Sequence, residues 1–225
     1  MAKIFQTLRN NWKKSIVFSG ALVYGVNYGK DRWKENELMR KFAAEAARFG
    51  EKSIPLANTR PYHVTVILNP AANGGKGRKN YEQYCAPLLH LAGLKVSVIR
   101  TEAQSQASEI MELMDDTDAV LVAGGDGTLM EAVTGLLRRK DVNLVSRTLP
   151  LGILPVGGNN HMAKRLCPDR IMDMNGSVPL MAEAAMNVIK RVYRPVDVME
   201  VKIKDEDATK KLRPLYGLRE VCIIS

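Results

Sequence analysis

The sequence predicts an α/β fold in which short strands alternate with helices and pair in a parallel sheet. Apolar runs of strand length recur along the chain, and segments with apolar residues at helical spacing lie between them. Glycine-rich turns directly follow three of these runs. Because a strand, a helix and a second strand of the same sheet form a parallel βαβ unit, the alternation indicates a parallel sheet.

The expected elements follow one another from residue 62 to residue 192. Strands are predicted from short apolar runs at residues 62–68, 95–100, 118–123 and 150–154. Helices are predicted from apolar residues at helical spacing at residues 81–91, 103–114 and 179–192. A further helix is expected after the third strand, where the residues at helical spacing are Leu129, Val133, Leu136 and Leu137.

After Pro195 the pattern changes to the alternation of a strand with one buried face. Residues 196–204 and 215–224 show this alternation, and charged residues separate them. We expect the first hairpin of an antiparallel β domain, incomplete because the sequence ends inside its second strand. The predicted organisation is an N-terminal segment with a linker in residues 1–60, an α/β domain in residues 61–195 and this hairpin in residues 196–225.

The net charge of +9 is concentrated in the N-terminal segment. Residues 1–60 carry 12 Lys and Arg against 5 Asp and Glu, a net of +7, and the rest of the chain is close to neutral. This distribution argues against a nucleic-acid partner, which requires a basic surface on the folded domain. The first 30 residues contain no acid, and an apolar stretch at residues 16–28 follows Lys13 and Lys14. Such a pattern is typical of a mitochondrial address or a signal anchor.

The apolar stretch predicts docking at a membrane surface. As a helix it would reach about 20 Å, whereas a hydrocarbon core is about 30 Å thick. We therefore expect interfacial binding, helped by the basic flank and by Trp12 and Trp33, rather than a full crossing. Burial of this stretch in the globular body is the alternative. An amphipathic helix is expected at residues 35–49, with Phe42 and Ala46 on its apolar side.

Cysteines and histidines form no recognisable ligand pattern. Their spacing contains no CxxC pair and no paired histidines, which argues against a disulfide framework and a structural zinc site. The residues concerned are Cys85, Cys167, Cys222, His63, His90 and His161. We predict no metal site built from these side chains.

The most informative turn is Gly124-Gly-Asp-Gly-Thr128, which links a buried strand to a helix. The free N–H groups of a new helix point outwards at the carboxyl end of a parallel sheet, where anionic ligands bind. Asp126 is unexpected there, because phosphates repel a carboxylate unless a divalent cation bridges them or the carboxylate takes part in proton or hydroxyl chemistry. The alternative is a structural turn with a helix-capping residue.

Two further glycine-rich turns follow strands. In the first, Asn69 and Pro70 end a strand and the glycines of residues 74–77 surround Lys76, which suits a flexible loop closing over phosphates. A solvated basic turn is the alternative. The other turn contains Gly157 and Gly158 and follows the strand at residues 150–154. Three such turns at three strand ends predict one polyphosphate-binding site. The chain lacks a Walker loop, a complete Gly-x-Gly-x-x-Gly and protein-kinase signatures.

These motifs resemble the three nucleotide-binding motifs of the diacylglycerol kinase catalytic domain, which sphingosine and ceramide kinases share. The residues are Asn69-Pro70 with the loop at 74–77, the turn at 124–128, and Pro155-Val-Gly-Gly-Asn-Asn160. The similarity covers roughly residues 60 to 200. Residues 86–93, 110–118 and 131–139 are similar to the mitochondrial acylglycerol kinases of this family.

The resemblance implies a nucleotide-binding domain of the diacylglycerol kinase catalytic type in residues 61–195, followed by a truncated β domain. It implies transfer of the γ-phosphoryl group of ATP, with Mg²⁺, to monoacylglycerol or diacylglycerol, giving lysophosphatidic or phosphatidic acid. It also implies a mitochondrial, membrane-associated protein at the inner membrane or intermembrane space. The carrier translocase of the inner membrane would be a possible partner.

The resemblance also assigns candidate site residues. Asp126 is the candidate for metal-linked or hydroxyl-activating chemistry. Thr101 matches a nucleotide-contacting position or caps a helix, and Glu131 orients groups in the site or sits in the first turn of a helix. Gly158 replaces the usual threonine of the third motif, which removes a hydroxyl contact. The predicted nucleotide-binding residues are Asn69, Gly74, Gly75, Lys76, Thr101, Gly124, Gly125, Gly127, Thr128, Glu131, Gly157, Gly158 and Asn160.

Two alternatives to a lipid kinase remain open at this point. The first is a non-catalytic scaffold or subunit of the carrier translocase, which the incomplete β domain and Gly158 favour. The second is a small-molecule kinase such as an NAD kinase or phosphofructokinase, which shares the Gly-Gly-Asp-Gly turn. The loop after Asn69 and the membrane-suited N-terminus argue against the second.

Overall fold

The computed structural model describes residues 12–52, 60–166, 177–201 and 215–218. The chain divides into two compact units, Met1–Lys41 and Phe42–Ser225. One helix, α2 (Trp12–Lys52), contributes residues to both units. Most of the predicted linker before residue 62 lies outside the described residues.

The second unit contains a four-stranded parallel sheet with the strand order β2-β1-β3-β4. The strands are β1 (His63–Leu68), β2 (Lys95–Arg100), β3 (Ala119–Gly124) and β4 (Leu151–Pro155). The predicted α/β fold class and parallel sheet are confirmed. Because β3 pairs with both β1 and β4, the three strands that precede glycine-rich turns are neighbours and end at the same edge of the sheet.

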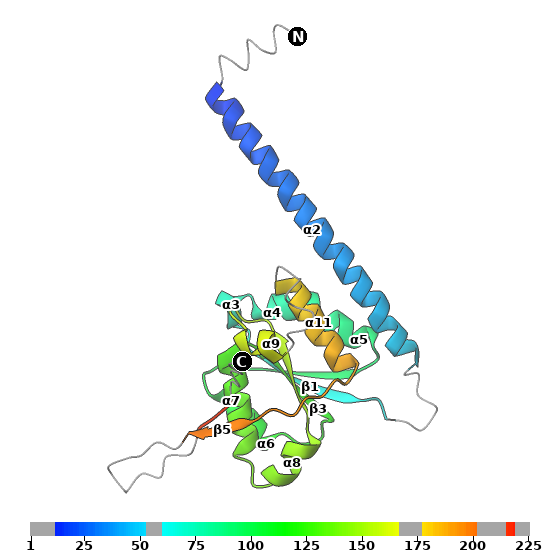
Figure 1. Cartoon of the computed structure of the whole chain (residues 1–225), viewed down its shortest axis with the longest axis vertical. Helices are drawn as coiled ribbons and strands as arrows, with labels where there is room; N and C mark the ends of the chain where they lie inside the picture. The colour runs from blue at the N-terminus through cyan, green and yellow to red at the C-terminus, as the bar shows by residue number, and fades with distance from the viewer. Residues whose placement is uncertain (1–11, 53–59, 167–176, 202–214, 219–225) are drawn as a thin grey trace, which may run out of the picture. The chain divides into compact units, whose positions relative to one another are not determined.

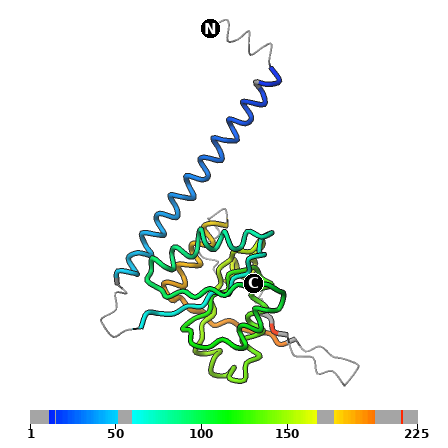
Figure 2. Tube along the Cα trace, turned by 180° about the vertical axis from the view of Figure 1, so that it is seen from behind, coloured from blue at the N-terminus to red at the C-terminus, as the bar shows by residue number. Residues whose placement is uncertain are grey.

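Helices cover both faces of this sheet (Figure 1), and the view from behind shows the same layers (Figure 2). One face carries the π-helix η1 (Tyr81–Cys85), α5 (Ala86–Leu91) and α11 (Ser177–Ile189). The other carries α6 (Gln106–Leu113), α7 (Asp126–Leu137) and α8 (Val142–Thr148). Short helices border the glycine-rich turns: α3 (Ala72–Gly75), α4 (Gly77–Asn80) and α9 (His161–Leu166).

One hydrophobic core lies between the sheet and the α6–α7 layer. Ile67, Val120 and Val122 point from the strands towards Met111 of α6 and Leu129 of α7, and all five side chains are buried. Burial of an apolar side chain of this size contributes about 1.5–3 kcal/mol. This packing fixes α7, and therefore the turn that precedes it, against β3.

Several helices differ from the sequence prediction. The helix expected at 81–91 is divided into η1 and α5. The helix expected from residue 103 begins at Gln106, because the Gln106 side chain accepts the N–H groups of Glu102 and Ala103 and holds them in a turn. The sequence did not predict α8, where Val145 alone is buried and apolar periodicity is therefore weak.

The C-terminal segment forms the antiparallel pair β5 (Val198–Val201) and β6 (Leu215–Leu218). The Thr134 hydroxyl of α7 lies 3.2 Å from the Tyr216 carbonyl oxygen and 3.4 Å from the Tyr216 nitrogen. This contact attaches β6 to α7. Val196 and Asp197, which were predicted as strand, precede β5 and are not part of it. Residues 202–204 and 219–224 lie outside the described part of the chain, and a larger β domain stays a prediction.

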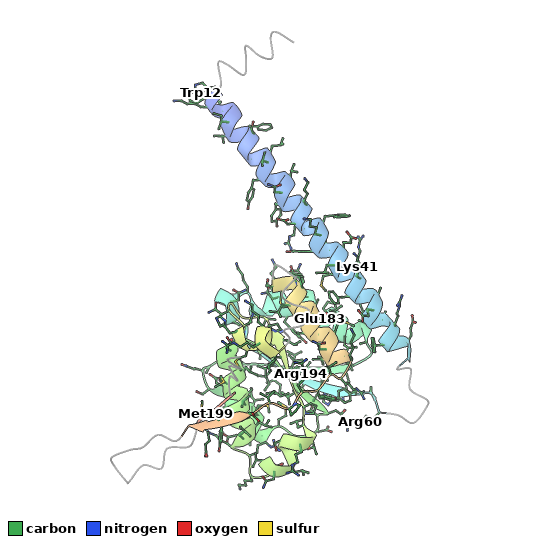
Figure 3. The ribbon with its side chains drawn as sticks, in the orientation of Figure 1. Trp12, Lys41, Arg60, Glu183, Arg194 and Met199 are labelled. Atoms are coloured by element: carbon green, nitrogen blue, oxygen red, sulfur yellow. The ribbon has the colours of Figure 1, made fainter. Side chains whose placement is uncertain are left out.

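In the first unit, α2 presents apolar side chains on its surface (Figure 3). Val17 and Phe18 are 72% and 70% exposed, and Trp12 and Trp33 are also exposed. Among the described residues, no helix combines the length and apolar character that a bilayer crossing requires. The first unit therefore offers an exposed apolar surface flanked by Lys13 and Lys14.

In the second unit, the end of α2 is amphipathic, as expected. Phe42 and Ala46 are buried, and Glu45 forms a 2.8 Å ion pair with Lys190 at the end of α11. Cys85 is fully buried nearby in the α5–α11 layer, and desolvation raises the pKa of its thiol to about 12. A thiol in that state stays protonated and is a poor nucleophile or metal ligand.

Helix α7 packs against α6 so closely at Gly135 that a side chain there has no room. A Cβ at this position would overlap the Ser108 carbonyl oxygen and lie 2.8 Å from the Met111 Cβ. We expect Gly135→Ala to lower the free energy of unfolding by about 1–3 kcal/mol through overpacking. Gly127→Ala is the matched control, because it lies in the same helix and no atom of the described residues is within 4 Å of the added Cβ. Denaturant unfolding of both variants tests this, and equal stability would contradict the packing.

Candidate functional site

The three glycine-rich turns meet at the carboxyl edge of the sheet. The Asn69 N–H, one residue past β1, donates to the Ala123 carbonyl at 2.9 Å. The Gly157 N–H, two residues past β4, donates to the Gly124 carbonyl at 3.2 Å. Both bonds continue the strand pairing into the turns, so β3 holds the first and third turns on either side of its own.

The turn after β3 presents the start of α7. Gly125 is the N-cap residue with extended backbone, and Asp126 begins the helix. The first N–H groups of a helix have no acceptor within it, and the helix dipole adds positive charge there. A Cβ on Gly124 would lie 2.6 Å from the Thr128 Cβ, so the turn requires glycine at that position. These features together form a small donor-rich surface.

Asn69 connects the first and second turns. Its amide Nδ2 donates to the Thr128 hydroxyl at 2.9 Å, and its Oδ1 accepts the Ala71 N–H at 3.0 Å. Thr128 is 7% exposed. The side chain predicted to contact nucleotide therefore also fixes the turn around Thr128.

The loop after Asn69 forms two short helical segments, α3 and α4, where the sequence predicted a flexible loop. Asn73 and Gly74 reverse the chain in the left-handed region, with φ of 55° and 63°, and Gly75 follows with φ of 84°. Glycine, and less readily asparagine, tolerates this conformation. Lys76 follows them with an exposed side chain, available to an anionic ligand.

The third turn packs directly on the second. A Cβ on Gly157 would lie 2.5 Å from the Gly125 Cα and 2.7 Å from the Asn160 Oδ1. Gly158 is different, because it is exposed and, among the described residues, a Cβ there would meet only the Asn73 Oδ1, at 3.7 Å. Glycine is thus required at 157 and tolerated at 158.

Asn160 holds the third turn together from inside. Its Nδ2 donates to the carbonyl groups of Pro155 at 2.9 Å and Gly157 at 2.7 Å. The residue is 3% exposed and has a left-handed φ of 49°. Its Oδ1 is buried without a hydrogen-bond partner among the described residues. Asn160 therefore supports the turn structurally, at some cost in stability.

Asp126 joins the second turn to the third. Its Oδ2 accepts the His161 N–H at 2.9 Å, and its Oδ1 accepts the Met162 N–H at 3.1 Å. These two amides open α9, so the carboxylate caps a helix far away in the sequence. Aspartate is a preferred capping residue. Asp126 lies 35 positions before the residue whose N–H it accepts, so no local sequence pattern predicts this contact.

Two other predicted residues border this centre. The Thr101 N–H donates to the Leu68 carbonyl at 2.9 Å, which places this buried residue beside the end of β1. The alternative that Thr101 caps a helix is wrong, because α6 begins at Gln106 after Ser105. Glu131 is the sixth residue of α7, and Asp126 is the acid in the first turn, so the first-turn alternative is also wrong.

Two cavities lie along β4, away from this edge. A cavity of about 390 Å³ lies between β4 and α11, and one of about 960 Å³ lies between β4, α7 and α8. Apolar side chains such as Leu151 and Ile153 line both. No glycine of the three turns contributes to either, so the turns form a separate surface.

A comparison with known protein families shows which family contains this sequence. Residues 63–201 match the diacylglycerol kinase catalytic domain, which is more than half of the chain and includes all three turns. The chain belongs to the diacylglycerol kinase catalytic domain family. The resemblance inferred from the three motifs is thereby confirmed.

Relatives of known name place the chain within this family. It is 41% identical to mitochondrial acylglycerol kinase of Xenopus laevis over 202 residues, covering 90% of this chain and 46% of the relative. It is 37% identical to the Mus musculus protein of the same name over 218 residues, covering 97% and 49%. The chain thus spans about half the length of these curated relatives. A solved putative diacylglycerol kinase from Bacillus anthracis shows 27% identity and a TM-score of 0.48, covering 63% of this chain and 43% of that one.

The contact between Gly157 and Gly125 yields a prediction for this diacylglycerol kinase catalytic domain. We expect Gly157→Ala to push the second and third turns apart and to weaken ATP binding roughly tenfold, which corresponds to a loss of about 1.4 kcal/mol. Gly29→Ala in α2, where no described atom lies within 4 Å of the added Cβ, is the control and should bind like the parent. Calorimetric titration with ATP measures both affinities, and thermal unfolding checks that each variant is folded. Equal affinities would show that the turns do not act together.

Proposed function

We propose that this chain forms the nucleotide-binding part of a lipid kinase. Its reaction is transfer of the γ-phosphoryl group of ATP to a free hydroxyl of monoacylglycerol or diacylglycerol, giving lysophosphatidic or phosphatidic acid. The observation that carries the proposal is the convergence of three glycine-rich turns on one sheet edge, closed by the contact of Gly125 with Gly157. The family and the names of the relatives supply the lipid acceptor.

The residues at the edge fit a nucleotide polyphosphate. Bare glycine backbone at 125 and 157 permits close approach, and the N–H groups that open α7 are suitable donors for phosphate oxygens. Lys76 in the first turn adds a positive charge at the end of a flexible side chain. Phosphoryl transfer depends mainly on positioning and charge stabilisation, which this set of groups provides without a covalent intermediate on the protein.

Mg²⁺ is the second proposed cofactor. Among the residues that the structure describes, no cluster of three or more acidic, histidine or cysteine side chains could hold a metal alone. Kinase Mg²⁺ instead uses one or two carboxylates together with phosphate oxygens and water. Asp126 accepts two N–H groups and retains lone-pair positions on both oxygens, so it can contact such an ion. The ion would supply neutralisation of the phosphate charge.

The alternatives left open by the sequence have less support. The family model and the named relatives are lipid kinases, which disfavours an NAD-kinase-like activity and a purely structural role. Assembly with the carrier translocase of the inner membrane is supported by the sequence resemblance alone.

We place this kinase at a mitochondrial membrane, at the inner membrane or its intermembrane-space side. The names of the relatives support the organelle. The exposed apolar residues of α2, such as Val17 and Phe18, support contact with lipid, and Lys13 and Lys14 complement anionic headgroups. A lipid acceptor would then be available in the surface to which the enzyme binds.

Phosphate transfer from radiolabelled ATP to monoacylglycerol and diacylglycerol in mixed micelles tests the proposed reaction. We expect Mg²⁺-dependent labelling of lipid by a chain extended to the length of the relatives, and loss of most of that labelling with Gly157→Ala. A parallel reaction offers NAD as a soluble phosphate acceptor, which tests the alternative of an NAD-kinase-like activity. Labelling of NAD in place of lipid, or no labelling by any chain, would remove the lipid-kinase assignment.

Vesicle flotation of the full chain tests the membrane contact. We expect stronger binding to vesicles with an anionic lipid than to phosphatidylcholine alone, weakened by salt. Reversal of Lys13 and Lys14 to Glu should reduce binding, since each basic residue near the surface contributes about 1 kcal/mol. Reversal of Lys95 and Lys140 to Glu, two exposed lysines of the second unit, is the matched control. Equal loss with the control would assign the contact to the second unit.

A further inference from the structure

Asp126 makes contacts that its expected metal-linked chemistry does not require. Both carboxylate oxygens are directed at α9, accepting the His161 N–H at 2.9 Å and the Met162 N–H at 3.1 Å. Asp126 begins α7, and α9 immediately follows the third glycine turn. One side chain therefore connects the ends of two loops that come from different strands.

The two amides depend on this carboxylate. They lie in the first turn of α9, where N–H groups have no acceptor within the helix. The helix begins its own bonding only at Lys164, whose N–H donates to the Asn160 carbonyl at 3.2 Å. Hydrogen bonds to a charged acceptor are about twice as strong as neutral ones. The carboxylate thus fixes where α9 starts.

The position of α9 sets the third turn. Asn160 directly precedes α9, and its amide group holds the carbonyls of Pro155 and Gly157. Gly157 is in turn the residue that contacts Gly125. A shift at the start of α9 is therefore transmitted through Asn160 to the surface between the second and third turns.

We propose that Asp126 is a positioning residue that holds the third glycine turn against the second, so that nucleotide affinity depends on Asp126 even without a divalent cation. The inference rests on the proposed function for the identity of the ligand. It adds a structural task to the metal-linked task assigned above, because the carboxylate retains lone-pair positions for both.

The sign of an affinity change separates the two tasks. In the absence of Mg²⁺, a carboxylate beside phosphates is repulsive, and Asp126→Asn removes that repulsion. If Asp126 acts only through the metal, the variant binds metal-free ATP as tightly as the parent or more tightly. If Asp126 positions the third turn, the variant binds metal-free ATP more weakly, because an amide presents a donor to one of the two N–H groups.

The experiment is calorimetric titration of ATP into the full chain in EDTA, with Asp126→Asn compared with the parent. Positioning predicts roughly tenfold weaker binding, the loss expected for one hydrogen bond to a charged group. Glu109→Gln, an exposed acid-to-amide change on α6, is the control and should leave affinity unchanged. Unchanged or tighter binding by Asp126→Asn would overturn the proposal.

Hydrogen exchange provides a readout that does not require a ligand. In the parent chain, the amides of His161 and Met162 should be protected from exchange, and Asp126→Asn should expose them. Asp126→Glu keeps the charge but lengthens the side chain by one methylene group. It should also increase the exchange rate of at least one of the two amides. If the variants do not fold, the parent still decides the matter, because rapid exchange of both amides there would overturn the proposal.

The two proposals fail in different ways. Absence of ATP binding by the parent both with Mg²⁺ and in EDTA, with both amides protected, would remove the nucleotide from the proposed function and leave the α9 contact established. Binding with Mg²⁺ but none in EDTA would overturn the proposal that Asp126 supports affinity without a divalent cation. ATP binding by the parent with unprotected amides would keep the nucleotide and remove the positioning role. Faster exchange with unchanged affinity in Asp126→Asn would also remove it.

Discussion

The placement of β3 between β1 and β4 is the constraint on which the rest of the structure depends. Parallel pairing on both sides brings three strand ends to one edge, and the N–H groups of Asn69 and Gly157 extend that pairing into the turns. Core packing of Leu129 with Val120 and Val122 then holds α7 against the same strand. Each turn directly follows a buried strand, so the pairing of the strands determines where the turns lie.

Glycine is essential at this edge for two separate physical reasons. At Gly74 and Gly75 the backbone has a positive φ, which other residues adopt only with strain. At Gly124 and Gly157 the backbone is ordinary, and the constraint is the lack of space for a Cβ beside Thr128 and Gly125. The first kind shapes a loop, and the second kind brings loops together.

The sequence was sufficient for the strands and for the main helices, because short apolar runs and helical spacing report directly on burial. It also identified the three turns, since glycine clusters after strands are local signals. The sequence could not predict the hydrogen bonds that connect one turn to another. The contact of Asp126 with His161 and the bond of Asn69 with Thr128 join residues far apart in the chain, and no local spacing encodes such pairs. Local competition also escaped prediction, as at Gln106, whose side chain delays the start of α6.

Asn160 illustrates what such a site implies for protein engineering. Its left-handed backbone disfavours the folded state, and so does its buried Oδ1, which has no hydrogen-bond partner in the described part of the chain. The second penalty is about 1–3 kcal/mol. A replacement that relaxes the backbone or removes the orphan acceptor would also remove the Nδ2 donor that the carbonyl oxygens of Pro155 and Gly157 accept from. Each buried carbonyl left without a donor costs about 1–3 kcal/mol. The penalties at Asn160 therefore cannot be removed by substitution without losing the hydrogen bonds that shape the turn.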